Sequence, residues 1–83
     1  MAYTRIERLG QIHDELERAN VLFPRKQVGP HEGYAVLLEE VDELWETVKS
    51  YKPSVGVTSD MRKEAIQVAA MALRFVEDVC DGQ

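Results

Sequence analysis

Acidic side chains recur in two parts of this sequence at spacings that place them on one face of a helix. The first group is Glu39-Glu40-x-x-Glu43, and the second is Glu64-x-x-Gln67. Side chains three or four residues apart are neighbours on a helix surface. Two such faces turned toward each other make an oxygen-lined site for a hard cation such as Mg²⁺, which binds carboxylates and keeps positions open for phosphate oxygens. The pattern therefore predicts a cation site between two helices.

A run of charges on a helix is also what a plain solvated surface looks like, and two details count against that alternative. At about 100° per residue, Glu40 and Glu43 share a stripe with Val36 and Thr47, which borders the apolar side of the helix. Five acids lie between residues 39 and 46 with no basic residue among them. Such neighbours repel by a few tenths of a kcal/mol per pair, roughly, and a bound cation relieves that repulsion.

The elements expected to position these acids are three helices in a single domain spanning residues 1–83. Apolar residues recur at steps of three and four over residues 4–22, 31–51 and 59–80, which is typical of amphipathic helices. Pro24 and Pro53 end the first two helices. No alternation typical of strands appears, so the expected fold class is all-α. The middle helix has the apolar seam Leu37, Val41, Leu44 and Val48.

The third expected helix, capped by Ser59 or Asp60, is unusually apolar. Ten of the twelve residues from Ala65 to Val76 are apolar, and only Gln67 and Arg74 interrupt them. A helix that is apolar nearly all round is a buried helix, and two further helices of one short chain cover only part of it. We therefore expect a homodimer, or a larger homo-oligomer, that completes a helical bundle.

The two polar residues inside that apolar run each have two interpretations. Gln67 is either a satisfied polar residue at the edge of the bundle or a member of the cation site beside Glu64, because a buried amide usually has a specific partner. Arg74 either reaches a phosphate or pairs with Asp78 one turn later, and the pairing is the favoured interpretation.

Composition excludes several function classes. The 83 residues carry a formal net charge of −5, which argues against nucleic acid or membrane surfaces as partners, since both require a basic footprint. Cys80 is the only cysteine, so neither an intrachain disulfide nor a cysteine zinc cluster is expected. No apolar run approaches the roughly 20 residues of a membrane span, and no signal-peptide pattern is present. The expected location is the cytoplasm.

At its acidic residues the chain resembles the all-α nucleoside triphosphate pyrophosphohydrolase superfamily, the MazG-like group. The signature of that family is Glu-Glu-x-x-Glu, a spacer of variable length, and then Glu-x-x-Asp. Residues 38–45 match the first half. Residues 64–67 match the second half, except that Gln67 stands in place of the aspartate. The resemblance covers residues 31–80.

The resemblance implies a helical dimer or tetramer that cleaves nucleoside triphosphates between the α and β phosphates, releasing a monophosphate and pyrophosphate. By motif position, Glu40, Glu43 and Glu64, with Gln67 at the fourth place, would bind Mg²⁺ or Mn²⁺. Glu39 would be an additional ligand or the base that orients water. These four glutamates are the candidate catalytic residues.

The sequence indicates residues that contact the substrate less specifically than it indicates the acidic motif. Lys49, Lys52 and Lys63 are candidate partners for triphosphate oxygens. Trp45 is either a core residue or a platform for a base, with the core interpretation favoured. Two other functions stay open: a non-catalytic helical dimer that binds a nucleotide or a protein, favoured by Gln67, and a different phosphohydrolase of the same superfamily, of the dUTPase or phosphoribosyl-ATP type.

Overall fold

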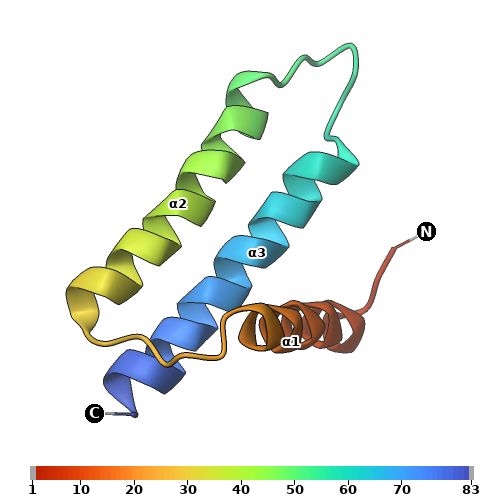
Figure 1. The fold of residues 1–83 in the computed structure, drawn as a ribbon. Coiled ribbons are helices and arrows are strands. Elements are labelled where there is room, and N and C mark those ends of the chain that lie inside the picture. Colours follow the sequence, from red (N-terminus) through yellow and green to blue (C-terminus); the bar gives the residue numbers. More distant parts are fainter. Residues whose placement is uncertain (1, 83) are drawn as a thin grey trace.

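The computed structural model describes residues 2–82 and is built from helices (Figure 1). Within that range it contains α1 (Arg5–Leu22), α2 (Pro30–Lys49), α3 (Ser59–Phe75) and a short π-helical segment, η1 (Val76–Cys80), with no strand. The all-α class and the three expected helices are confirmed.

Polar side chains just before α1 and α3 define where these helices begin. Thr4 accepts a hydrogen bond from the backbone of Glu7 at 3.1 Å, and Glu7 accepts one from the backbone of Thr4 at 2.8 Å. This reciprocal capping leaves Thr4 outside the helix. At α3 the cap is Thr58, whose hydroxyl accepts from the backbone of Met61 at 3.2 Å. The expectation that Ser59 or Asp60 caps α3 was wrong by one or two residues.

The second helix is shifted by one or two residues from its expected range. It begins at Pro30, which suits the first helical position because that residue needs no N–H donor there. It ends at Lys49 rather than at Tyr51, whose N–H bonds to the carbonyl of Val48 at 3.1 Å in a tighter turn.

The end of the third helix differs from the continuous α-helix expected to residue 80. After Phe75 the backbone widens into η1, where the N–H of Asp81 reaches the carbonyl of Val76, five residues back, at 2.8 Å. Within this turn Asp78 accepts hydrogen bonds from the backbone of Gln27 at 3.1 Å and from Arg74 at 3.3 Å. The wider turn is thus tied to the loop between α1 and α2.

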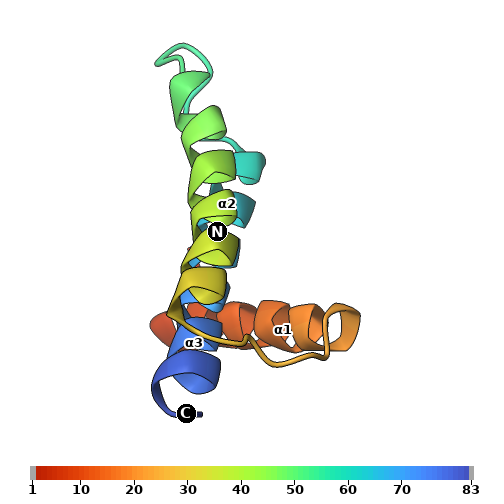
Figure 2. The ribbon, with the colours of Figure 1, turned by 60° about the vertical axis from the view of Figure 1, so that its left-hand side comes forward.

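The helices pack as an antiparallel pair with a third helix laid across it. Helices α2 and α3 run side by side in opposite directions, and α1 crosses α3 near its C-terminal half (Figures 1 and 2). The buried core lies where the three helices meet. Its members are Leu16, Ala19, Ala70 and Met71, with Ile12, Val36 and Leu37 packed against them.

Much apolar surface stays uncovered in the single chain. The molecule measures 46 × 27 × 20 Å, and its radius of gyration of 14.0 Å exceeds the value of about 12 Å for a compact domain of this length. Leu38, Val41, Trp45 and Val48, at helical spacing on α2, are 38–55% exposed. Leu73 on α3 is 38% exposed. The nearly all-round burial expected for the third helix is therefore not reached within one chain.

Over residues 2–82, none of the helices has the length and apolar character needed to cross a membrane.

Candidate functional site

Three carboxylates converge between α2 and α3. Glu40 and Glu43, three residues apart, project from one face of α2, and Glu64 projects from α3. One carboxylate oxygen from each lies within 4.8 Å of the others. Glu40 and Glu64 are half-buried, and Glu43 is exposed. The antiparallel packing of the two helices therefore brings together the two acidic groups that are separate in the sequence.

The electrostatics of this cluster favour a cation. Burial raises the pKa of Glu40, and the neighbouring charges of Glu43 and Glu64 raise it further. The pKa of Glu64 is raised by burial first and then by Glu43. Both effects oppose ionisation, and a cation held between the carboxylates reverses them. Carboxylate oxygens are the donors that Mg²⁺ and Mn²⁺ bind, so the residues present fit such an ion.

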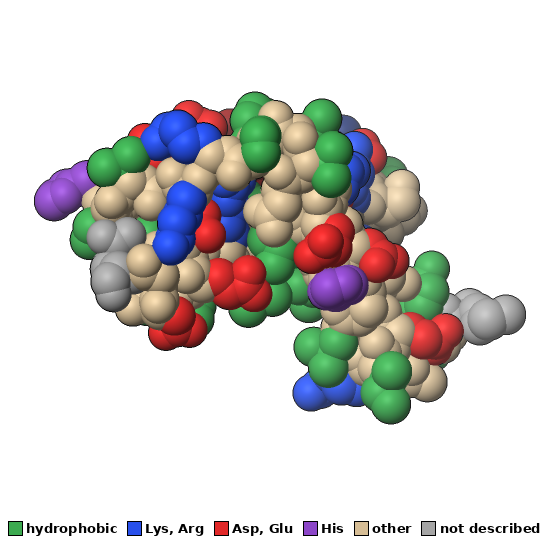
Figure 3. Space-filling model, turned by 60° about the horizontal axis from the view of Figure 1, so that its bottom comes forward, with side chains coloured by type: hydrophobic (Ala, Val, Ile, Leu, Met, Phe, Trp, Pro, Cys, Tyr) green, Lys and Arg blue, Asp and Glu red, His purple; other side chains and the backbone are tan. Residues whose placement is uncertain are grey.

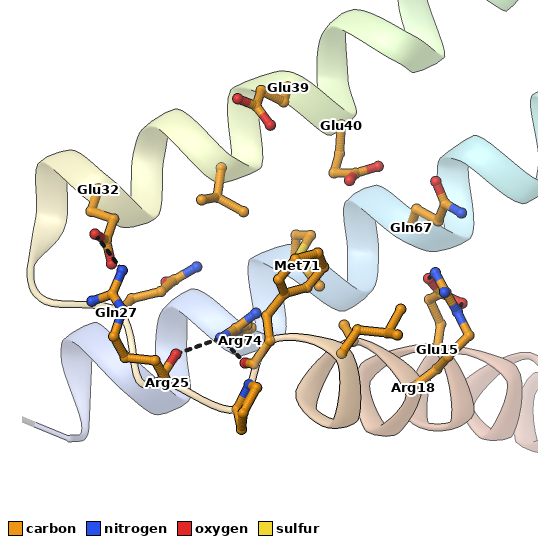
Figure 4. Close-up of a pocket in the computed structure, with 15 residues that line it drawn as sticks. Glu15, Arg18, Arg25, Gln27, Glu32, Glu39, Glu40, Gln67, Met71 and Arg74 are labelled. Carbon is orange, nitrogen blue, oxygen red and sulfur yellow. Dashed lines mark hydrogen bonds and ion pairs between the residues drawn. The ribbon is translucent and has the colours of Figure 1, made fainter.

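Gln67 lies within this cluster, on the same face of α3 as Glu64. We assign its amide with the nitrogen toward the acids, because the opposite orientation, drawn in Figure 4, leaves its oxygen facing only acceptors. In the assigned orientation Nε2 donates to Glu40 Oε2 at 3.1 Å and to Glu64 Oε2 at 2.9 Å. Gln67 is therefore a satisfied polar residue that lies beside the carboxylates, and both interpretations of it remain open. It acts there as a donor to the carboxylates, so it ligates a cation only if its oxygen is turned inward.

An open cavity of about 600 Å³ is lined by residues of α1, α2, α3 and the loop between α1 and α2, and Glu40 is the member of the carboxylate cluster in its wall. Glu40 and Gln67 form one part of its wall and face each other across the gap between their helices (Figure 4). In the space-filling view the surface is hollowed between two lobes, with hydrophobic side chains visible in the hollow and charged ones at its edges (Figure 3). The volume lies within the range of about 300–1,000 Å³ for small-molecule sites.

The cavity wall combines apolar and basic side chains. Leu22, Phe23, Val36 and Met71 supply apolar surface. Arg18 also lines it and pairs with Glu15 on the same helix at 2.6 Å. Nothing in the sequence marks Arg18, because an arginine three residues after a glutamate on an exposed helix face is a common surface pair.

Arg74 lines the cavity too, and its Nε and Nη2 donors are engaged within the chain. It is buried and pairs with Asp78 at 3.3 Å, which confirms the favoured interpretation. Its Nη2 also donates to the carbonyls of Phe23 at 2.8 Å and Arg25 at 2.9 Å (Figure 4). Asp78 is half-buried and also accepts a hydrogen bond from the backbone N–H of Gln27 at 3.1 Å. Arg74 therefore connects α3 to the loop after α1.

Two further candidate residues, Glu39 and Lys63, lie outside the cluster of three carboxylates. Glu39 is exposed and lines the cavity, but it is not part of the three-carboxylate cluster. Lys63 is exposed beside Glu64 and borders a smaller hollow that Gln67 also lines.

Two predicted substrate contacts lie apart from the cavity. At about 100° per residue, Trp45 and Lys49 are turned roughly 140° and 180° around α2 from Glu40. Lys49 pairs with Glu46 at 2.9 Å. Trp45 is 55% exposed, so the core interpretation favoured for it does not hold within one chain.

Comparisons of this chain with models of protein families, with characterised proteins and with solved structures found no significant match.

Proposed function

We propose that this chain is a divalent-cation-dependent pyrophosphohydrolase of nucleoside triphosphates. The observation that carries the proposal is the convergence of Glu40, Glu43 and Glu64, because Glu40 also lies in the wall of a nucleotide-sized cavity. The reaction class comes from the resemblance of residues 38–45 and 64–67 to the MazG-like signature. In this reaction water adds across the anhydride between the α and β phosphates, and the products are a monophosphate and pyrophosphate.

The chain's own residues supply binding and orientation. Glu40, Glu43 and Glu64 would hold Mg²⁺ or Mn²⁺, which supplies charge neutralisation for the phosphate oxygens and a more acidic bound water. Glu39 on the cavity wall would orient the attacking water and accept its proton. Arg18 is paired with Glu15, and the side chain of Arg18 is 56% exposed. Exposed pairs contribute little stability, so the guanidinium is free to turn to a phosphate. Lys63 remains a candidate phosphate contact from α3.

Trp45 and Lys49 belong to this proposal only through an oligomer. Because they lie on the far side of α2 from Glu40, they contact a nucleotide only if a second chain brings them to its cavity. Within one chain they play no part in the proposed reaction.

A non-catalytic nucleotide-binding dimer is the second candidate, and Gln67 favours it. Its amide donates to both Glu40 and Glu64, and hydrogen bonds of this kind stabilise ionised carboxylates without a cation. In this alternative the cavity binds a nucleotide and the anhydride stays intact.

The deciding experiment measures products from all common ribo- and deoxyribonucleoside triphosphates with Mg²⁺ or Mn²⁺, with pyrophosphate and phosphate quantified separately. We expect pyrophosphate and a monophosphate in equal amounts, and none in EDTA. Glu40→Gln should reduce the rate by about 100-fold or more, because loss of even an indirect metal contact commonly reduces activity by 10- to 100-fold. Glu46→Gln, on the same helix but outside the cluster, is the matched control. Nucleotide binding without turnover would favour the second candidate, and release of phosphate alone would contradict the proposed bond cleavage.

A further inference from the structure

One buried side chain in the cavity wall makes no hydrogen bond. Gln27, in the loop between α1 and α2, is only 4% exposed. Among the described residues, neither its Nε2 nor its Oε1 has a hydrogen-bond partner. In Figure 4 its amide end is directed toward the middle of the cavity. Buried amides are almost always paired, because an unpaired one destabilises the fold. Both amide atoms are closed off from water as well, with Oε1 beside Gly33, so a ligand in the cavity completes these bonds once the amide turns toward it.

The backbone that carries this amide is held firmly. The N–H of Gln27 donates to Asp78 Oδ2 at 3.1 Å. Arg74 donates to the same Asp78 oxygen and to two carbonyls of the loop, those of Phe23 and Arg25. These bonds fix the main chain and leave the amide at the end of a short side chain whose last torsion turns easily.

Helix α2 leaves room for the amide at Gly33. A Cβ atom built at Gly33 would lie 2.8 Å from Gln27 Oε1 and 2.7 Å from a ring carbon of Phe75. A side chain at this position would displace the amide, so the glycine keeps a space for it. The contact with Gly33 is steric and gives Gln27 no polar partner.

The surroundings of Gln27 restrict the chemistry of the ligand. Leu22, Val36 and Met71 give the cavity apolar walls, against which a flat ring packs well. An amide presents a donor and an acceptor side by side, and it forms two parallel hydrogen bonds with a ring edge of the complementary pattern, as glutamine does with adenine. Each common nucleobase has such an edge. A phosphate group is tetrahedral and presents no flat edge of this kind.

We propose that Gln27 recognises the edge of a nucleobase within the cavity. This inference rests on the proposed function and deepens it, because Glu40 and Gln67 line another part of the same cavity, where the phosphates of a nucleotide would lie. Gln27 then acts as a base-binding residue and has no part in the hydrolytic step.

The test uses nucleosides without phosphates, in EDTA, so that neither a cation nor turnover is needed. Adenosine, guanosine, cytidine and uridine are titrated into the full chain by calorimetry. We expect at least one to bind, and Gln27→Leu to weaken that binding by tenfold or more. Gln11→Leu, which removes a glutamine of α1 outside this cavity, should leave nucleoside affinity unchanged. The melting temperature of Gln27→Leu should equal or exceed that of the wild type, because the variant buries no unpaired amide.

A second measurement does not depend on the variant folding. In the wild-type chain labelled with ¹⁵N, the side-chain amide signals of Gln27 should shift on addition of the binding nucleoside. A base-methylated form that blocks the edge, such as N3-methyluridine for uridine, should cause a smaller shift. Absence of binding by all four nucleosides, or unchanged binding by a folded Gln27→Leu, would overturn the inference. If nucleosides bind but no pyrophosphate is released from triphosphates, the proposed reaction is refuted and the inference about Gln27 stands.

Discussion

The amide nitrogen of Gln67 on α3 lies 3.1 Å from a carboxylate oxygen of Glu40 on α2. This contact joins the two helices at the point where the resembling family has an aspartate. The amide shields part of the repulsion among the acids, but it brings no charge for a cation. If the carboxylates bind a cation as proposed, the strength of that binding and the stability of the cation-free fold should depend on the same residue.

Replacing Gln67 tests this dependence directly. Gln67→Asp should raise Mg²⁺ affinity by about tenfold or more, because the cation gains the attraction of another charge. In EDTA the same variant should lose about 1.5–3 kcal/mol of unfolding free energy, the typical contribution of a hydrogen bond to a charged group. Calorimetric titration and thermal melts measure the two effects. A variant that binds Mg²⁺ more weakly would show that residue 67 lies outside the cation site.

Divalent cations should stabilise the folded chain. A cation at a hundredfold excess over its dissociation constant adds about 2.7 kcal/mol. Glu40→Gln and Glu43→Gln should each reduce the Mg²⁺-induced rise in melting temperature. Glu46→Gln should matter much less, since Glu46 is paired with Lys49 outside the cluster. Equal effects of all three variants would instead indicate an ordinary solvated acidic surface.

The pH dependence of stability should change sign when a cation is added. In EDTA the raised pKa values of Glu40 and Glu64 mean that the fold favours their protonated forms. Their contribution to unfolding free energy is therefore largest below the ordinary value of 4.5 and falls as the pH rises through the raised values. A bound cation favours the ionised forms, so the contribution should rise with pH at saturating Mg²⁺.

This pH effect is isolated by comparing the wild type with Glu40→Gln in denaturant melts. In EDTA the variant should gain stability relative to the wild type as the pH rises above the ordinary carboxyl value of 4.5, because the pKa of Glu40 is raised. Asp42→Asn, on the exposed side of α2, is the control for removing a carboxylate. A difference between wild type and Glu40→Gln that is the same at every pH would contradict the assignment.

Two helix glycines should respond oppositely to alanine. At Gly33 a Cβ meets the ring of Phe75 at 2.7 Å, so Gly33→Ala should destabilise the fold by about 1–3 kcal/mol. At Gly10 nothing lies within 4 Å of the built Cβ. Gly10→Ala should therefore stabilise α1 by about 0.5–1 kcal/mol. Thermal melts of both variants provide the comparison, and a loss of stability at Gly10 would contradict the packing described.

The chain should associate through the apolar stripe of α2. Sedimentation equilibrium at micromolar concentration should give at least twice the chain mass of 9.5 kDa, because a partner would cover the exposed Val41 and Trp45. Val41→Lys should shift the equilibrium toward the monomer. Val57→Lys, at an exposed valine in the loop before α3, is the matched control. A stable wild-type monomer would remove the expectation of a dimer.

The helices and their polar faces could be predicted from the sequence because they depend on local periodicity. Glu40 and Glu43 share a face wherever that helix is placed, and Pro24 stops α1 through its own backbone chemistry, whereas α2 ends at Lys49, before Pro53 is reached. The helix ends were less accurate. Thr58 caps α3 in place of the neighbouring Ser59, since several adjacent side chains are able to form the same bond and the geometry of the preceding loop selects one.

The site itself depends on contacts between residues distant in the chain. Glu64 meets Glu40 because α2 and α3 pack antiparallel in one register, and no local pattern specifies that register. Gln27 is one polar residue in a short loop, with nothing in its neighbours to mark it. Its burial arises from Asp78 and Arg74, some fifty residues away, which hold the loop against α3. Periodicity specifies which side of a helix a residue occupies, whereas packing between helices specifies which residue it faces and whether water can reach it.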